Sequence, residues 1–229
     1  IKWACDVETY VKNVSDVFNT LILSDDFKAS SLDAGVSESW SFYNKYLPHE
    51  EYMKQCEGFT ASKYDPKAWV ELIKESGAQY TVLTTKHHDG VALWDTKQNG
   101  ISVVKNTPAK RDLVTPFVNE VRKAGLRLGL YYSLPDWSHP DYPNMTRTDV
   151  RYKDDPKRWD DFCKFNFGQL KELNTTYKPD LYWFDGDWEM SAETWRAKEI
   201  MELLRSTNKD VIVNSRITGY GDYATPEQG

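Results

Sequence analysis

Ionisable side chains follow several apolar runs of this sequence, at the points where the runs end. Asp185 closes the run at 181–184, and the consecutive pair His87 and His88 follows the run at 80–85. A carboxylate at the end of a buried strand is costly unless it has a partner or a task. A carboxylate can attack or transfer protons, and neutral imidazoles can hydrogen-bond hydroxyl groups. This set suggests a site that binds a hydroxyl-rich ligand and attacks it.

Asp185 needs a second carboxyl group if it is to cleave a glycosidic bond with retention. Retaining hydrolysis uses two carboxyl groups about 5–5.5 Å apart. Glu227 lies in the loop after the next predicted strand, and neighbouring loops of a barrel can bring such residues together. Without other evidence, a plain surface glutamate is the better explanation of Glu227. Asp187 is the weaker candidate for nucleophile, because Gly186 favours a turn before it.

A metal site is less favoured by the same residues. His87 and His88 are consecutive at a strand end, so their side chains are expected to diverge, and no carboxylate or cysteine spacing completes a zinc set. Arg216 fits two roles equally well, a ligand-binding or nucleophile-steadying group and a structural salt bridge. No serine or cysteine lies in a nucleophile elbow. The sequence therefore predicts chemistry without a metal or organic cofactor.

These side chains must be positioned by alternating helices and strands. Asp65 and Pro66 are typical of a helix start, and Gly77 of its end. Further helices are predicted at 116–124, 157–173 and 192–205, and strands at 80–85, 126–133, 180–185 and 211–214. Repeated strand–helix units indicate parallel strands joined by right-handed crossovers.

The polar strand ends favour a barrel over an open sheet. A (β/α)8 barrel gathers the C-terminal ends of all its strands at one mouth, whereas an open sheet uses only those near its switch point. Four strands are clear and 18–23 is a candidate fifth, so the barrel is complete only if further strands exist. We expect 1–229 to be a single catalytic α/β domain of TIM type, complete or partial, with an atypical segment at 1–35 and its last strands not evident.

Composition excludes several classes of protein. The net charge of −6 provides no basic stripe for nucleic acid, and no apolar run approaches a membrane span. Nine Trp and 14 Tyr lean weakly toward carbohydrate binding, although a bulky aromatic core explains them better. Three glycosylation sequons, at Asn13, Asn144 and Asn174, hint at a secreted, periplasmic or lysosomal protein.

Several ordered segments resemble the signatures of glycoside hydrolase family 29, the α-L-fucosidases. They are residues 77–94, 108–114, 125–133 and 179–185, within a resemblance that covers about residues 36–229. Several motifs in consistent order are more specific than any one of them. The resemblance implies a retaining hydrolase that removes terminal α-linked L-fucose from a fucosylated oligosaccharide or glycoconjugate.

The resemblance also implies roles for single residues. Asp185 matches the nucleophile in the family's Trp-x-Asp segment, and Glu227, in a Thr-x-Glu segment 42 positions later, matches the acid/base. Glu38 and Trp40 resemble an adjacent Glu-Trp pair that contacts fucose, with Ser39 inserted between them here. The other residues that match fucose-binding or nucleophile-holding positions are His87, His88, Tyr131 and Arg216.

The N-terminal part departs from the family pattern and motivates an alternative. Family members open with a strand whose histidine binds fucose, but residues 18–25 stand at that place here and no histidine precedes His49. The alternative is an inactive fucose-binding module or a truncated barrel fragment without turnover. A third hypothesis is a barrel hydrolase that uses the histidine pair on a metal, which loss of activity with a chelator would support.

Overall fold

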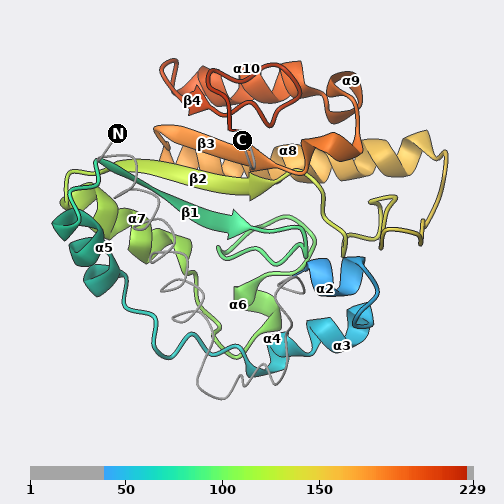
Figure 1. Ribbon diagram of the computed structural model, residues 1–229, viewed down its shortest axis with the longest axis horizontal. Coiled ribbons are helices and arrows are strands. Elements are labelled where there is room, and N and C mark those ends of the chain that lie inside the picture. The colour runs from blue at the N-terminus through green and yellow to red at the C-terminus, as the bar shows by residue number, and fades with distance from the viewer. Residues whose placement is uncertain (1–38, 226–229) are drawn as a thin grey trace, which may run out of the picture.

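A computed structural model describes residues 39–225 and shows an α/β fold around one parallel sheet (Figure 1). The sheet contains β1 (Tyr80–Lys86), β2 (Arg127–Ser133), β3 (Leu181–Asp185) and β4 (Ile212–Val213), in the order β1-β2-β3-β4. Ser133 lies opposite Asp185 in the register, and Lys86 lies opposite Tyr132. The C-terminal ends of the first three strands are therefore level with one another.

The strand order separates two ways of building a parallel sheet. A doubly wound sheet reverses its order at a switch point, whereas the four strands here follow one another without reversal. Right-handed crossovers between strands in this order place the connecting helices on one face, as in a barrel. A complete barrel is not shown by these four strands. The prediction of an α/β fold with parallel strands is confirmed.

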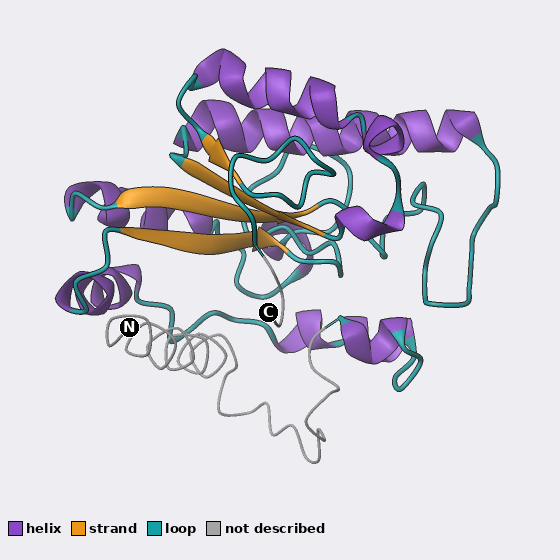
Figure 2. Cartoon of the chain, turned by 45° about the horizontal axis from the view of Figure 1, so that its top comes forward, coloured by secondary structure: helices purple, strands orange, loops and turns teal. Residues whose placement is uncertain are grey.

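Four helices accompany the strands, and two of them begin at local sequence signals. Helix α5 (Pro66–Glu75) begins after Asp65, whose side chain accepts the Ala68 N–H, and α8 (Pro156–Tyr177) begins in the same way after Asp155. Helices α5 and α7 lie beside β1 and β2, whereas α8 and α10 lie beside β3 and β4 (Figures 1 and 2). The bounds of the other two are Val114–Lys123 (α7) and Ala197–Thr207 (α10).

The single helix predicted at 192–205 is wrong in one respect, because the chain breaks it. Helix α9 (Ala192–Trp195) ends at Arg196, which has a left-handed backbone (φ 55°), and α10 starts directly afterwards. The break is held in place, since Arg196 forms an ion pair with Asp160 of α8 at 2.7 Å. Short helices that the sequence pattern did not predict are α2 (Trp40–Tyr43), α3 (His49–Met53), α4 (Gln55–Gly58), α6 (Val103–Asn106) and the 3-10 turn η1 (Asp187–Glu189).

Strand β4 is shorter than predicted because a side chain replaces part of its ladder. The Asn214 side chain accepts the Phe184 N–H at 2.8 Å and donates to the Phe184 carbonyl at 3.0 Å. These two bonds continue the β3–β4 pairing beyond Val213 and fix the chain that leads to Arg216. None of the helices within residues 39–225 is long and apolar enough to cross a membrane.

Candidate active site

Asp185 lies where three strands end, and donors from each side hold its carboxylate. Tyr131 of β2 donates its hydroxyl to Oδ2 at 2.7 Å, and Arg216 donates Nη1 to Oδ1 at 2.5 Å. The Gly186 N–H also donates to Oδ1, at 3.0 Å. Such charge-assisted bonds stabilise the anion and fix its direction. The structure therefore brings together Asp185, Tyr131 and Arg216, three of the predicted site residues.

Gly186 directs the chain away from this carboxylate. Its backbone is left-handed (φ 81°), and a Cβ there would lie 2.3 Å from Pro135 Cδ and 3.3 Å from His88 Cε1. A side chain larger than hydrogen would clash with the loop after β2 and crowd His88. The turn that Gly186 was expected to favour is confirmed, and it separates Asp187 from Asp185.

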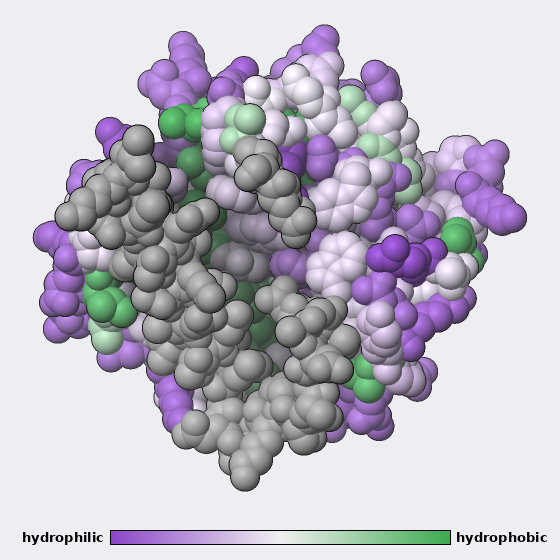
Figure 3. All heavy atoms as spheres, viewed as in Figure 1, coloured by the Kyte–Doolittle hydropathy of each residue, from purple (hydrophilic) through white to green (hydrophobic). Residues whose placement is uncertain are grey.

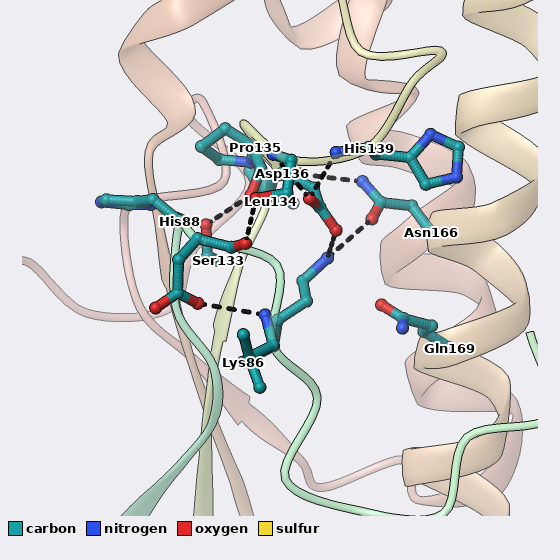
Figure 4. Close-up of polar contacts among 12 residues, drawn as sticks. Lys86, His88, Ser133, Leu134, Pro135, Asp136, His139, Asn166 and Gln169 are labelled. Atoms are coloured by element: carbon teal, nitrogen blue, oxygen red, sulfur yellow. Dashed lines mark hydrogen bonds and ion pairs between the residues drawn. The ribbon is translucent and has the colours of Figure 1, made fainter. Parts of the chain in front are cut away.

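His88 is held in one tautomer by Ser133. Its Nδ1 lies 2.6 Å from Ser133 Oγ, and the Ser133 hydroxyl donates its only proton to the Pro135 carbonyl at 2.7 Å (Figure 4). Ser133 must accept from His88, so the imidazole carries its proton on Nδ1 and a lone pair on Nε2. Burial lowers the pKa of His88 to about 2, with His87, Lys86 and Arg216 adding to the effect. The ring is therefore neutral.

The lone pair of His88 faces another acceptor. His88 Nε2 lies 3.7 Å from Asp185 Oδ2, which is beyond hydrogen-bond distance. Two acceptors this close repel each other unless a donor is shared between them or added beside them. A ligand hydroxyl provides such a donor, so this part of the site is built to accept an O–H group.

His87 and His88 converge, contrary to the expectation from strand alternation. Strand β1 ends at Lys86, so alternation does not govern the next two residues, and the ring centroids lie only 4.2 Å apart. The ring of His87 stacks on Tyr131 at 5.6 Å and 4°, and its Nδ1 lies 3.0 Å from Ser39 Oγ. Ligand atoms of His87, His88 and Asp185 lie within 4.8 Å of one another, so the fold brings to the pair a carboxylate that the sequence spacing did not indicate.

The positions of these three side chains would allow a metal ion, but the charge of Arg216 beside them opposes one. A divalent cation at His87, His88 and Asp185 would lie close to the guanidinium of Arg216, which already binds the same carboxylate at 2.5 Å. The two positive charges would repel each other in a partly buried site. The hydrogen-bonding arrangement fits a hydroxyl-rich ligand better than a metal ion.

Trp40 joins the site through its neighbours. Its indole contacts the His88 ring edge-on at 5.7 Å and the Trp137 ring at 5.2 Å. Trp40, which the resemblance makes a fucose-contacting residue, thus lies beside His88. Glu38 and Glu227, the latter being the predicted second carboxyl group, lie outside the described residues.

A buried ion pair between Lys86 and Asp136 lies next to the two histidines. Lys86 is fully buried, and its Nζ lies 3.5 Å from Asp136 Oδ2 (Figure 4). The same Nζ donates to the Tyr132 hydroxyl at 3.1 Å. Burial lowers the pKa of Lys86 to about 8, although Asp136 opposes that shift. The pair ties the end of β1 to the loop after β2, where the backbone N–H of Trp137 donates to the His88 carbonyl at 2.8 Å.

Sequence reasoning missed the residues that orient the site. No role was predicted for Ser133 or Ser39, yet each contacts Nδ1 of one histidine. Both contacts join residues more than 40 positions apart. Pairing of strand ends was the one signal that could have linked Ser133 to His88.

Comparison with known proteins places the chain in a family. Residues 24–229 match the family model for alpha-L-fucosidase. The alpha-L-fucosidase of Dictyostelium discoideum is 33% identical over 192 residues, covering 82% of this chain and 41% of that protein. Alpha-L-fucosidase isoenzyme 1 from Paenibacillus thiaminolyticus superposes with a TM-score of 0.77 at 35% identity, covering 85% of this chain and 50% of that one.

A second similar structure is described as a trapped covalent intermediate. A GH29 alpha-L-fucosidase from Bacteroides thetaiotaomicron, described as a trapped covalent intermediate with 2-fluoro-fucosyl fluoride, has a TM-score of 0.69 and 33% identity. The match covers 81% of this chain and 43% of that protein. The chain spans about two-fifths of the length of the curated relatives it matches. On the family match and these likenesses, the chain belongs to the alpha-L-fucosidase family.

Proposed function

We propose that this protein is a retaining α-L-fucosidase that removes terminal α-linked L-fucose from fucosylated glycans. The observation that carries the proposal is the Asp185 carboxylate, held by Tyr131, Arg216 and the Gly186 N–H beside a neutral His88. A carboxylate whose direction is fixed by three donors is prepared to attack a carbon atom. The covalent intermediate described for the Bacteroides relative agrees with such a step.

In the first half of the proposed reaction, Asp185 attacks C1 of fucose. The carboxylate oxygen forms a bond to C1 while the bond from C1 to the glycosidic oxygen breaks. Glu227 gives its proton to that oxygen, so the leaving sugar departs neutral and Glu227 becomes a carboxylate. In the second half, Glu227 takes a proton from water, which attacks C1 and releases Asp185. Tyr131 and Arg216 hold the nucleophile throughout.

The sugar is oriented by the remaining side chains. A fucose hydroxyl donates to the Nε2 lone pair of His88, which relieves the repulsion between Nε2 and Asp185 Oδ2 at 3.7 Å. His87, Trp40 and Glu38 complete the proposed fucose-binding set. No metal or organic cofactor takes part in this scheme.

The nucleophile is tested by replacing Asp185 with alanine. We expect Asp185→Ala to lose turnover of an aryl α-L-fucoside and azide to restore part of it, because azide can enter the space left by the carboxylate and attack C1. Asp187→Ala is the matched control, two residues along the chain, and should keep most of the activity. Full activity in Asp185→Ala would rule out the assignment. Fucose binding by calorimetry without turnover in the wild type would favour the binding-module alternative, and loss of activity with a chelator would favour the metal hypothesis.

The finer points of fold and location belong to the same proposal. We propose that residues 1–229 form part of one catalytic (β/α)8 barrel, which is supported by a strand order without reversal. A structure of a longer chain with no parallel neighbour beside β1 or β4 would oppose it. A secreted, periplasmic or lysosomal location would fit a glycan substrate.

A further inference from the structure

Trp188 is an exposed aromatic side chain next to the proposed nucleophile. It follows Asp185 by three residues and is 53% exposed, which makes it the one exposed tryptophan within residues 39–225. Its indole stacks with Trp40 at 6.3 Å and 17°, and meets the His88 ring edge-on at 5.9 Å. The exposed ring thus borders two residues of the candidate active site.

The turn that presents Trp188 is anchored on both sides of it. Glu189 accepts hydrogen bonds from Trp137 Nε1 at 2.8 Å, the Tyr142 hydroxyl at 2.5 Å and Asn144 Nδ2 at 2.9 Å. On the other side, the carbonyl of Asp187 accepts from Trp195 Nε1 at 2.9 Å. Trp188 is therefore fixed in place by its neighbours while its own ring stays open to solvent. A ring held in one place binds a flat partner at little conformational cost.

The side from which the leaving group departs indicates what lies beside the Trp188 indole. The leaving oxygen departs from C1 on the side opposite to the attacking carboxylate, and the Asp185 side chain is only 14% exposed. The leaving sugar must therefore lie on the solvent side of the fucose ring. Pale, ring-bearing side chains face outward near the middle of the molecular face in Figure 3. An exposed indole fits the C–H face of a pyranose by size and polarity.

We propose that Trp188 is a binding platform for the pyranose ring to which fucose is linked. The inference rests on the proposed fucosidase function and adds a site for the leaving group. Trp188 contacts the leaving sugar and not the fucose. Its effect on the rate therefore depends on whether the leaving group is a sugar.

Two substrates separate this role from any effect on fucose itself. α-L-Fucosyl fluoride has no sugar in its leaving group, whereas an α-fucosyl-N-acetylglucosamine disaccharide has one. We expect Trp188→Ala to lower kcat/KM for the disaccharide about tenfold and to leave kcat/KM for the fluoride within about twofold. Trp188→Phe should keep most of the disaccharide activity. Tyr80→Ala is the matched control, since Tyr80 is 54% exposed and stands at the opposite end of β1.

Equal loss on both substrates would overturn the proposal, because Trp188 would then contact fucose or support the fold. No loss on either substrate would overturn it as well. If the wild type turns over neither substrate, the proposed function fails. The role of Trp188 in binding the second sugar is then tested separately by calorimetry. The Asp185→Ala protein should then bind the disaccharide more tightly than fucose, and Trp188→Ala should remove that difference. A disaccharide that binds no better than fucose would contradict the platform directly.

Discussion

The hydroxyl of Ser133 decides which nitrogen of His88 carries the proton, and this can be tested by removing it. In the wild type, His88 Nδ1–H donates to Ser133 Oγ at 2.6 Å, and Nε2 is left as an acceptor. Ser133→Ala removes the acceptor without adding bulk. The Nδ1–H would then be buried without a partner, whereas a proton on Nε2 would face Asp185 Oδ2 at 3.7 Å. We expect the proton to move to Nε2.

The size of the effect follows from the lost hydrogen bond. A buried donor without a partner costs about 1–3 kcal/mol, and this drives the change of tautomer. Once Nε2 carries the proton, it no longer accepts from a fucose hydroxyl, so a similar free energy is lost from substrate binding. Since about 1.4 kcal/mol corresponds to a factor of ten, kcat/KM should fall about 5- to 150-fold.

Two measurements are needed on the same protein. ¹⁵N NMR of the histidine side chains identifies the protonated nitrogen, and hydrolysis of an aryl α-L-fucoside gives kcat/KM. Ser102→Ala is the matched control, because Ser102 is also fully buried but caps helix α6 by accepting the Lys105 N–H. It should lower stability without changing the tautomer of His88. A proton on Nε2 in the wild type would refute the reasoning, as would an unchanged kcat/KM after the tautomer had switched.

Two further predictions concern charge at the site. Tyr131→Phe removes one charge-assisted hydrogen bond to Asp185, which is worth about 1.5–3 kcal/mol. We therefore expect kcat/KM to fall about 10- to 150-fold while the circular dichroism spectrum stays unchanged. A fall of less than twofold would contradict a role for Tyr131 in holding the nucleophile. Burial lowers the pKa of His88 from 6.5 to about 2, so below pH 6.5 the unfolded chain binds a proton there that the native chain does not. Stability should therefore fall as the pH falls through this window, by up to about 1.4 kcal/mol per pH unit from this residue, and His88→Gln should reduce that slope in urea titrations at pH 6, 5 and 4. An identical slope in both proteins would show that His88 ionises normally.

The alternation of helices and strands could be read from the sequence because its signals are local. Asp65 and Asp155 cap their helices through side-chain bonds three residues along, and apolar runs mark the strands. The short helices α2, α3, α4 and α6 were not predicted, because a single helical turn is too short to show a hydrophobic period. The role of Asn214 could not be predicted, because the sequence does not show that its side chain takes the place of backbone hydrogen bonds in the β3–β4 pairing.

The candidate site was predictable in its residue types but not in its connections. Strand ends pointed to Asp185 and Tyr131, since parallel strands bring those ends together. The convergence of His87 and His88 was not predictable, because it depends on where β1 stops. Roles that came only from family resemblance, such as that of Glu227, still await the tests above.

Two of the three sequons turned out to serve the fold. Asn174 is fully buried in α8 and donates to the carbonyls of Leu203 and Leu204, both at 3.2 Å. Asn144 donates its amide to Glu189 at 2.9 Å. A glycan at Asn174 has no room in the folded chain, and one at Asn144 would break an anchor of the turn that carries Trp188. Neither residue supports the prediction of a secreted protein.

Gly186 limits how the reaction centre can be redesigned. Any larger residue there would push the Pro135 ring and the edge of His88 at once, because all three positions share the space of a single methyl group. The position after Asp185 thus tolerates only glycine unless Pro135 and His88 shift. Substitutions that probe residue 185 should therefore leave Gly186 unchanged, so that the positions of Pro135 and His88 are kept.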